Sequence, residues 1–329
     1  MKKAVIIILS VLLVCLLGIG GYTYFYMNSL LNQVKQSPLS SQNLSPAALA
    51  KSLSIAKDAP KEEATGVFNI LLFGLDRRSK DEASRSDSIM IASIDTKNKT
   101  VKLSSIMRDT YLAIPGKADN RINAAYAMGG AELAIKAINQ NFNMDIKRYV
   151  TVDFFELTAI IDKMGGVDIN VKRDEIPFIH QYLVELNKLD TNTPFARDIT
   201  KPGLQRLNGK QAVAYTRNRY SGNGDFQRTE RQRTVLTALF DKAKSKGISN
   251  VAALAAAVLP YVETNIPKSE MVDFGIKVIG FGNTNLQQYR LPVDGTYKSR
   301  VISGMEVLVP DLQKNTDLLH KFLFDNTNQ

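Results

Sequence analysis

The sequence predicts an α/β fold, a layered α-β-α arrangement around a central mixed sheet, with an N-terminal transmembrane helix in front of it. Short apolar runs and amphipathic stretches alternate from Gly66 onward, and 44% hydrophobic with 22% charged residues is a globular composition. A long uncharged run at the start predicts the membrane helix. We expect a cytoplasmic tail at 1–3, an anchor at 4–27, an extracellular stalk at 28–65 and an extracellular domain at 66–329.

The run at 4–27 contains no charged residue and is dominated by Ile, Val and Leu, so it can span a bilayer as a helix. A cleaved signal peptide is the alternative, but it requires a short apolar core followed by small residues. Here the run continues into aromatic residues such as Tyr22 and Tyr24, which are typical of a membrane interface. Lys2 and Lys3 precede it, so the positive-inside rule predicts a single-pass membrane protein with its N-terminus in the cytoplasm.

Cys15 is the only cysteine, so the exported part has neither a disulfide nor a thiolate metal site. Residues 28–65 are rich in Ser, Gln, Asn, Ala and Lys without a sustained apolar period. We interpret them as a stalk, with a helical turn or two near 46–56. The remaining residues suffice for one large α/β domain.

Strands and helices interleave in this domain, which favours a layered sheet. Residues 172–203 are polar, irregular and contain three prolines, so we expect a lid or an insertion there. The expected strands lie at 67–75, 87–95, 100–107, 149–153, 167–171 and 286–292. The expected helices lie at 124–141, 155–164, 208–218, 225–246, 249–262, 268–279 and 311–324.

Chain direction places several charged residues at one edge of the sheet. If the strand at 67–75 runs upward, Asp76 follows at its top, and Asp87 begins the next strand at that same top. The turn at 96–99 reverses the chain again, so the third strand ends at the same edge with Arg108 and Asp109. This edge, which we call the rim, is expected to collect Asp76, Arg77, Arg78, Arg85, Asp87, Arg108 and Asp109.

Asp76 and Asp87 are the candidate metal ligands of the rim. Two carboxylates without thiols or nearby histidines suit a hard cation such as Mg²⁺, or Mn²⁺ as an alternative, which takes phosphate oxygens as further ligands. Alternatively, both are turn or capping residues paired with adjacent arginines. The number of arginines at the same rim favours the metal.

A second charged group lies on either side of a Gly-rich turn, and it consists of Arg217, Arg219, Arg228, Arg231 and Arg233. Arg228, Arg231 and Gln232 are three and four positions apart, so one helix face presents them. Guanidinium groups bind phosphate bidentately, and the use of Arg without Lys favours a phosphate site over a solvated basic face paired with Glu230 and phospholipid. Asp225 is well placed as a helix N-cap, although it could also reach a substrate hydroxyl.

These motifs, in this order, resemble the LytR-CpsA-Psr family, enzymes that attach anionic or capsular glycans to the bacterial cell wall. The departures are Met107, where the family often has proline, and Arg121, where lysine is common. Beyond Val235 no resemblance is evident. The matching segments are residues 71–76, 85–90, 105–110, 121–126, 165–168 and 207–232.

The resemblance implies a cell-membrane enzyme of a bacterium, Gram-positive by type, that transfers a glycan from polyprenyl pyrophosphate to a peptidoglycan sugar hydroxyl. Peptidoglycan, the lipid-linked donor and the membrane are then the partners, and nucleic acid is not. Asp76 and Asp87 would hold Mg²⁺. Asp109 and Asp225 are the candidates for accepting the hydroxyl proton, and Arg108 completes the catalytic set. The pyrophosphate would be bound by Arg108, Arg121, Arg217, Arg219, Arg228 and Gln232, and we add Arg85 from the rim.

The prenyl tail requires an apolar slot, and the helices at 154–164 and 251–262 have suitable surfaces, although core packing also explains those residues. Two other functions are kept as alternatives: a non-enzymatic binder of anionic wall polymer, and a hydrolase of the lipid-pyrophosphate glycan. The identity of the polymer, the proton acceptor, the oligomeric state and the role of 172–203 stay open.

Overall fold

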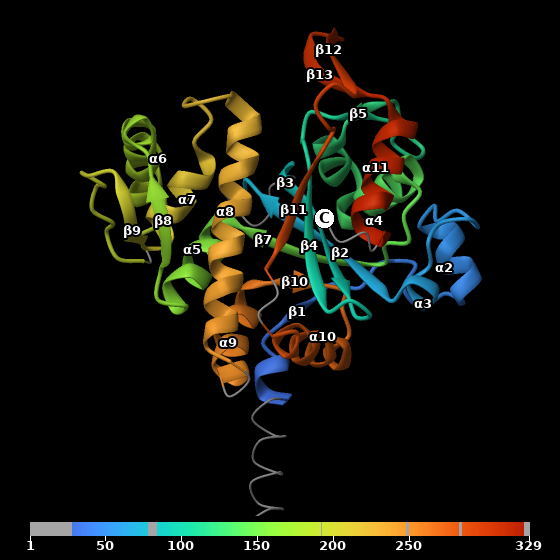
Figure 1. Ribbon diagram of the computed structural model, residues 1–329, viewed down its shortest axis with the longest axis horizontal. Helices are drawn as coiled ribbons and strands as arrows, with labels where there is room; N and C mark the ends of the chain where they lie inside the picture. The colour runs from blue at the N-terminus through green and yellow to red at the C-terminus, as the bar shows by residue number, and fades with distance from the viewer. Residues whose placement is uncertain (1–27, 78–83, 192, 248–249, 283–284, 326–329) are drawn as a thin grey trace, which may run out of the picture.

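The computed structural model describes residues 28–77, 84–191, 193–247, 250–282 and 285–325 (Figure 1). The predicted anchor at 4–27 and Arg78 of the rim lie outside these ranges. Within them, no helix has the length and apolarity that a bilayer crossing requires.

A seven-stranded mixed sheet forms the centre of the molecule, which confirms the predicted α/β class. Neighbouring strands β2, β3 and β4 are antiparallel, whereas β7 is parallel to β2 and β11 is parallel to β4. The five predicted strands that enter this sheet are confirmed to within a residue at each end. In sheet order the strands are β1 (Lys35–Gln36), β10 (Glu263–Thr264), β7 (Arg148–Asp153), β2 (Val67–Leu75), β3 (Ser86–Asp95), β4 (Thr100–Ile106) and β11 (Gln287–Leu291).

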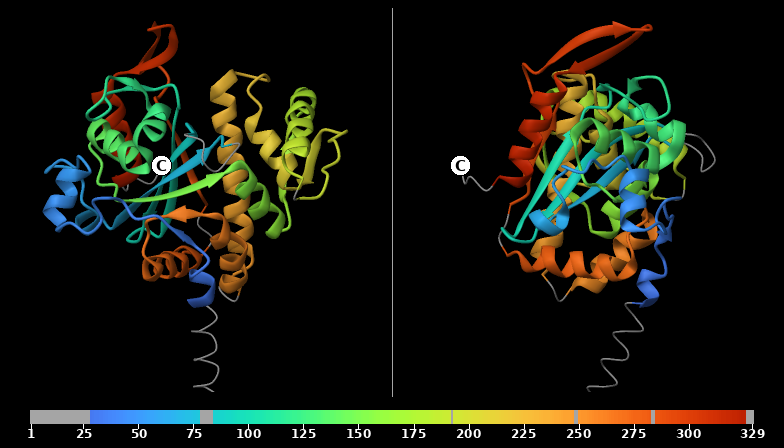
Figure 2. Two further views of the ribbon diagram at one scale, coloured as in Figure 1. Left: turned by 180° about the vertical axis from the view of Figure 1, so that it is seen from behind. Right: turned by 90° about the vertical axis from the view of Figure 1, so that its right-hand side faces the viewer.

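Helices cover both faces of the sheet (Figures 1 and 2). Leu71 and Phe73 of β2 face one core, which contains residues of α4 (Ile122–Phe142) and α11 (Leu312–Phe324). Ile70 points to the other face and packs with Phe274 of α10 (Lys268–Gly280). Because both faces are covered, β2 is an almost continuous apolar run rather than an alternating one.

Residues 28–65 do not form a separate stalk, contrary to the prediction. Their β1 strand pairs in parallel with β10 at the sheet edge, and Leu39, Leu53 and Ile55 are buried in the core that contains α4. These apolar residues are irregularly spaced, which is why no period revealed them. The helices of this segment include α2 (Pro46–Ser52) and α3 (Glu62–Thr65).

A second core lies beside the sheet and joins helices that follow β7. The predicted strand at 167–171 exists as β8 (Val167–Val171), but it pairs with β9 (Gly203–Leu207) in a separate two-stranded sheet. The segment 172–203 is not irregular throughout, because Ile179, Leu183 and Leu186 bury one face of a helix in this core. The helices of this part are α5 (Phe154–Lys163), η1 (Arg173–Glu175), α6 (Ile176–Leu189), α7 (Gly209–Arg217), α8 (Gly224–Ser245), α9 (Val251–Val258) and η3 (Leu259–Tyr261).

Two small sheets were not predicted. The strands β5 (Tyr111–Leu112) and β6 (Asn120–Arg121) pair next to the rim. The hairpin of β12 (Tyr297–Ile302) and β13 (Met305–Pro310) projects from one end of the molecule (Figure 1). The backbone N–H of Leu308 donates to the carbonyl oxygen of Asp109 at 2.9 Å, so this hairpin is attached directly to the rim.

Capping fixes where α5 and α7 begin. The Asp153 side chain accepts from the backbone N–H of Glu156, and Asn208 does the same for Gln211. The two helices then pack closely at Gly209, where an added Cβ would lie 2.2 Å from the carbonyl oxygen of Thr158. This contact matters for the site because α7 ends at Arg217 and α5 begins at Phe154.

We expect Gly209→Ala to lower the free energy of unfolding by about 1–3 kcal/mol, because a backbone oxygen cannot move away without shifting a helix. Gly275→Ala in α10 is the matched control. Its Cβ would meet no described atom within 4 Å, so stability should stay the same or rise by up to about 1 kcal/mol. Urea denaturation of both variants measures the difference, and equal stabilities would show that α5 and α7 can separate at no cost.

Candidate functional site

The rim forms as chain direction predicts. Since β2, β3 and β4 are antiparallel neighbours, the end of β2, the start of β3 and the end of β4 share one edge. Asp87 and Arg108 meet there, with Nη1 of Arg108 2.9 Å from Oδ1 of Asp87. The alternative paired both carboxylates with adjacent arginines. Both do contact guanidinium groups, but those of Arg108, Arg217 and Arg228, which come from distant parts of the chain.

Three residues of the rim and three arginines of the second charged group line one polar pocket of about 370 Å³. This juxtaposition, predicted from two separated stretches of the chain, is confirmed. Arg217 enters from the last turn of α7, while Arg228 and Gln232 lie one helical turn apart on α8. The lining residues are Asp76, Asp87, Arg108, Phe154, Gln181, Tyr182, Glu185, Thr216, Arg217, Arg219, Tyr220, Arg228 and Gln232.

Arg108 is the centre of the charge network. Besides Asp87 it contacts Asp225, whose Oδ2 lies 3.2 Å from Nη2, and Asp109, whose Oδ2 lies 3.5 Å from Nε. Burial by itself lowers the pKa of Arg108, but the three carboxylates outweigh it and raise that pKa above its ordinary value. Arg108 therefore lies between the polar pocket, which it lines, and a pair of carboxyl groups, Asp109 and Asp225.

Asp109 and Asp225 form that pair, because both carboxylates contact Arg108. Burial raises the pKa of Asp109, and the neighbouring Asp225 raises it further against the attraction of Arg108. For Asp225 burial also acts upward, but Arg228 and Arg108 outweigh it and lower its pKa. Of the two carboxyl groups, Asp225 is therefore the stronger acid, and Asp109 keeps its proton to a higher pH.

Asp225 is not the N-cap of its helix. Asn223 occupies that position, and Asp225 is the second residue of α8. Its carboxylate instead turns toward Arg108 and Arg228, whose Nη2 lies 3.2 Å from Oδ1. The Asp225 carboxylate binds these two guanidinium groups rather than capping the helix backbone, because two charged donors attract a carboxylate more strongly than one backbone N–H.

Two arginines of the pocket are oriented by aromatic rings. Arg217 lies between Phe154 and Tyr182, with its guanidinium carbon 4.9 Å and 5.0 Å from the two ring centroids. Its Nη2 is 3.9 Å from Oδ2 of Asp76. Arg219 donates to the Tyr220 hydroxyl at 3.0 Å. Stacking covers the faces of a guanidinium group, so its N–H groups meet anions in the plane of the fork, as Arg217 meets Asp76 and Glu185.

Other predicted residues lie elsewhere. Arg121 is paired with Asp109 at 3.2 Å and does not line the polar pocket, and Arg85 is exposed beside the rim without lining it. Arg231 is buried behind the pocket, where its Nε donates to Glu175 at 2.8 Å and its Nη1 to the carbonyl of Asn218 at 2.8 Å. Arg231 thus holds the loop that carries Arg219, and helix spacing alone could not separate it from Arg228.

Sequence reasoning missed the aromatic and acidic residues that α6 contributes. Tyr182 and Glu185 lie in the segment interpreted as irregular, and Glu185 Oε2 is 3.3 Å from Nη1 of Arg217. The spacing of Ile179, Leu183 and Leu186 was the signal that would have revealed this helix.

An apolar cavity of about 350 Å³ adjoins the polar pocket and shares Phe154, Thr216 and Gln232 with it. It runs between β2, α5, α8 and α9, so the helices predicted to offer apolar surfaces do line a cavity. Its further walls include Leu72, Met90, Leu157, Ile160, Val235, Leu239, Ala243, Leu254 and Val258.

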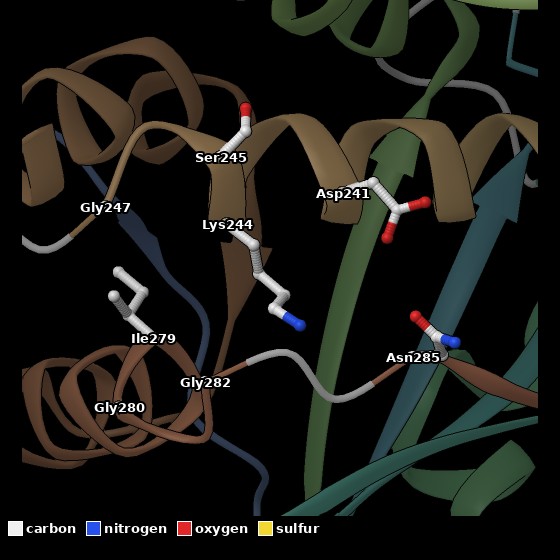
Figure 3. A pocket seen from close by; sticks show the side chains of 8 residues that line it. All are labelled: Asp241, Lys244, Ser245, Gly247, Ile279, Gly280, Gly282 and Asn285. Atoms are coloured by element: carbon white, nitrogen blue, oxygen red, sulfur yellow. The ribbon is translucent and has the colours of Figure 1, made fainter.

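A separate surface hollow lies at the C-terminal end of α8, beside α10 (Figure 3). Asp241, Lys244 and Ser245 of α8 border it together with Asn285. It shares no lining residue with the polar pocket, so it is not part of the predicted site.

A LytR_cpsA_psr family model matches residues 23–321. The chain belongs to the LytR-CpsA-Psr family. The match continues well beyond Val235, where the motifs alone gave no resemblance, so the C-terminal helices and the β12–β13 hairpin are part of the family domain.

Relatives within the family carry different names. The chain is 32% identical to the regulatory protein MsrR of Staphylococcus aureus over 77% of this chain and 72% of that protein. It is also 32% identical to TagU of Bacillus cereus, a polyisoprenyl-teichoic acid–peptidoglycan teichoic acid transferase, over 83% of this chain and 82% of the relative. The solved structure of TagT with bound octaprenyl pyrophosphate lipid has the same fold, with a TM-score of 0.62, 22% identity and coverage of 87% of this chain and 99% of that one.

Proposed function

We propose that the protein is a membrane-anchored phosphotransferase that moves an anionic or capsular glycan from polyprenyl pyrophosphate to a hydroxyl of a peptidoglycan sugar. The hydroxyl oxygen forms a bond to the glycan-bearing phosphorus, and the bond from that phosphorus to the bridging oxygen breaks. Polyprenyl phosphate leaves with the electron pair, and the hydroxyl proton passes to a carboxylate of the protein. The product is a phosphodiester.

The main observation behind this proposal is that the polar pocket and the apolar cavity adjoin each other. The polar pocket holds four arginines, whereas the adjoining cavity is lined mainly by aliphatic and aromatic side chains. A prenyl pyrophosphate has the same division, with a doubly charged head on an apolar tail. The octaprenyl pyrophosphate bound to TagT and the transferase name of TagU support this choice of donor.

The charged residues of the pocket are suited to a pyrophosphate. Arg108, Arg217, Arg219 and Arg228 can donate to phosphoryl oxygens, and Gln232 lies where the polar pocket meets the apolar cavity. Burial and the neighbouring Arg108 lower the pKa of Arg228, which shows that positive charge is crowded there. An anionic ligand relieves this crowding, and the same donors stabilise the charge that grows on the leaving phosphate.

Asp76 and Asp87 fit a Mg²⁺ ion, with Mn²⁺ as the alternative. Mg²⁺ is commonly bound by one or two carboxylates together with substrate phosphates, and these two line the same pocket as the phosphate-binding arginines. Within the described ranges no group of three or more His, Cys, Asp or Glu could hold a metal, so phosphate oxygens and water would supply the other ligands. The ion would offset charge on the transferred phosphoryl group.

The anchor at 4–27 belongs to the same proposal, and it would place the domain outside the cell. The first described residues and β1 lie at one end of the molecule, and the β12–β13 hairpin lies at the other (Figures 1 and 2). A lipid-linked donor would therefore reach the domain from the β1 end.

The test is transfer by the purified full-length chain in detergent, supplied with a synthetic prenyl-pyrophosphate oligosaccharide, a soluble peptidoglycan oligomer and Mg²⁺. We expect mass spectrometry to detect the phosphodiester, and we expect EDTA to abolish it and Mg²⁺ or Mn²⁺ to restore it. Asp87→Asn should also lose the product, because it removes a metal ligand.

Three outcomes contradict parts of the proposal. No product with Mg²⁺, together with tight binding of anionic wall polymer, would favour the polymer-binding alternative. Release of glycan phosphate without an acceptor would favour hydrolysis. Full activity in EDTA would exclude the metal but leave the transferase.

A further inference from the structure

A groove of about 570 Å³ lies on the other side of Arg108, between the start of α8 and the β12–β13 hairpin. It shares no lining residue with the polar pocket. Its lining includes Asp109, Asp225 and Phe226, together with Arg300, Val301 and Leu308 of the hairpin. Both members of the carboxyl pair therefore open onto it.

We propose that this groove binds the acceptor, a strand of peptidoglycan sugars, and presents its hydroxyl to the carboxyl pair. This inference rests on the proposed function and adds to it the place where the second substrate enters. The general base must lie within hydrogen-bond reach of the hydroxyl it deprotonates, and Asp109 and Asp225 face this groove.

The order of the three cavities along α8 supports the assignment. Asn223 to Phe226 line the groove, Arg228 and Gln232 line the polar pocket, and Val235, Leu239 and Ala243 line the apolar cavity. In phosphoryl transfer the attacking and leaving oxygens lie roughly in line on opposite sides of the phosphorus. With the prenyl phosphate leaving toward the apolar cavity, the attacking hydroxyl must arrive from the start of α8.

The position of the groove also fits a wall polymer. The helix α8 starts at the end that carries the β12–β13 hairpin and runs toward the end that carries β1 and α9 (Figure 1). With the proposed anchor at the β1 end, the groove faces away from the membrane, toward the cell wall. Donor and acceptor then approach the phosphorus from opposite ends of the molecule.

Several contacts attach the hairpin to the rim and to α8, so that it forms one wall of the groove. The Leu308 N–H bonds to the Asp109 carbonyl, and Thr110 bridges to Leu308. Phe226 stacks on Tyr297 with ring centroids 6.0 Å apart, and the Arg290 guanidinium lies 4.6 Å from the Phe226 centroid. These contacts fix the hairpin against α8 and set the width of the groove.

The exposed wall of the groove suits a glycan strand with acidic peptides. Val301 is 70% exposed, although it is a large aliphatic residue, and Arg300 beside it is also exposed. An apolar side chain can pack on the face of a sugar ring, while the guanidinium can pair with a peptide carboxylate. Both positions can be changed without touching the core.

The experiment measures transfer as a function of acceptor concentration, with the same full-length chain, prenyl-pyrophosphate oligosaccharide and peptidoglycan oligomer. Arg300→Glu and Val301→Asp should raise the KM for the acceptor by roughly tenfold, as expected for the loss of one charge contact or one apolar contact. The Kd of the donor should not change. Lys298→Glu is the matched control, because it makes the same charge change on β12 outside the groove and should keep the wild-type KM.

An unchanged acceptor KM in both groove variants would overturn the inference, and so would an equal rise in the Lys298→Glu control. If the donor Kd rises instead, the groove holds the donor glycan and the inference is also wrong. Should the wild type show no transfer, the proposed function fails, and direct binding of the peptidoglycan oligomer decides the groove separately. Weaker binding by Arg300→Glu than by Lys298→Glu supports it, and equal binding refutes it.

Discussion

Replacing Asp109 and Asp225 together by asparagine should lower the kcat of transfer by about 10²–10⁴-fold, the usual contribution of a positioned general base. Asparagine keeps the shape of both side chains but cannot accept the hydroxyl proton. The donor should bind as tightly as before or more tightly, because negative charge is removed from the side of Arg108. Initial-rate assays with saturating substrates measure kcat, and titration with a fluorescent prenyl pyrophosphate measures the donor Kd.

The pH profile separates this role from a structural one. Burial raises the pKa of Asp109 above its ordinary value, so Asp109 loses its proton at a higher pH than an exposed aspartate would. The base form grows as the pH rises through that range, and the wild-type kcat/KM should rise with it. The double variant should lack this rise. A double variant with the wild-type kcat and profile would exclude the pair as proton acceptor.

Filling the apolar cavity should have the second largest effect. Ala243 lines the cavity on α8, three helical turns beyond the Gln232 position that borders the polar pocket. Ala243→Trp should weaken binding of a long-chain prenyl pyrophosphate by about 10²–10³-fold, since each excluded CH₂ forfeits about 0.8 kcal/mol and an isoprene unit has five carbons. Donors with a short prenyl chain should bind as to the wild type, because their tails do not reach this wall.

Titration with a series of prenyl pyrophosphates of increasing length measures this dependence. Ser245→Trp is the control of equal bulk, since Ser245 borders the surface hollow of Figure 3 and does not line the apolar cavity. It should leave every Kd unchanged. An equal loss for short and long chains in Ala243→Trp would indicate a damaged fold rather than a blocked tail.

The part of the site that the sequence predicted depends on short connections. The turn at 96–99 forces β3 and β4 to be antiparallel neighbours, so the direction of each strand, and with it the position of Asp87 and Arg108, follows from counting reversals. Helix spacing then placed Arg228 and Gln232 on one face of α8. These inferences need no knowledge of distant contacts.

The remaining features depend on contacts between distant segments. Arg228 and Arg231 look equivalent in the sequence. Arg231, however, forms a buried ion pair with Glu175 and so does not reach the polar pocket. The role of Asp225 likewise depends on Arg108, which lies far away in the chain. The β12–β13 hairpin was missed although Ser303 and Gly304, both with positive φ, form a recognisable turn between two strand-like runs.

The edge pairing of β1 decides where the chain can be shortened. A protein beginning at Gly66, the boundary that composition suggests, would leave the carbonyl oxygens of Val262 and Thr264 without the Lys35 and Ser37 N–H groups that now bond to them. It would also uncover the core around Leu53. An exposed strand edge beside bare apolar surface is a template for pairing between molecules, so such a fragment should aggregate, whereas one beginning at residue 28 keeps its edge protected.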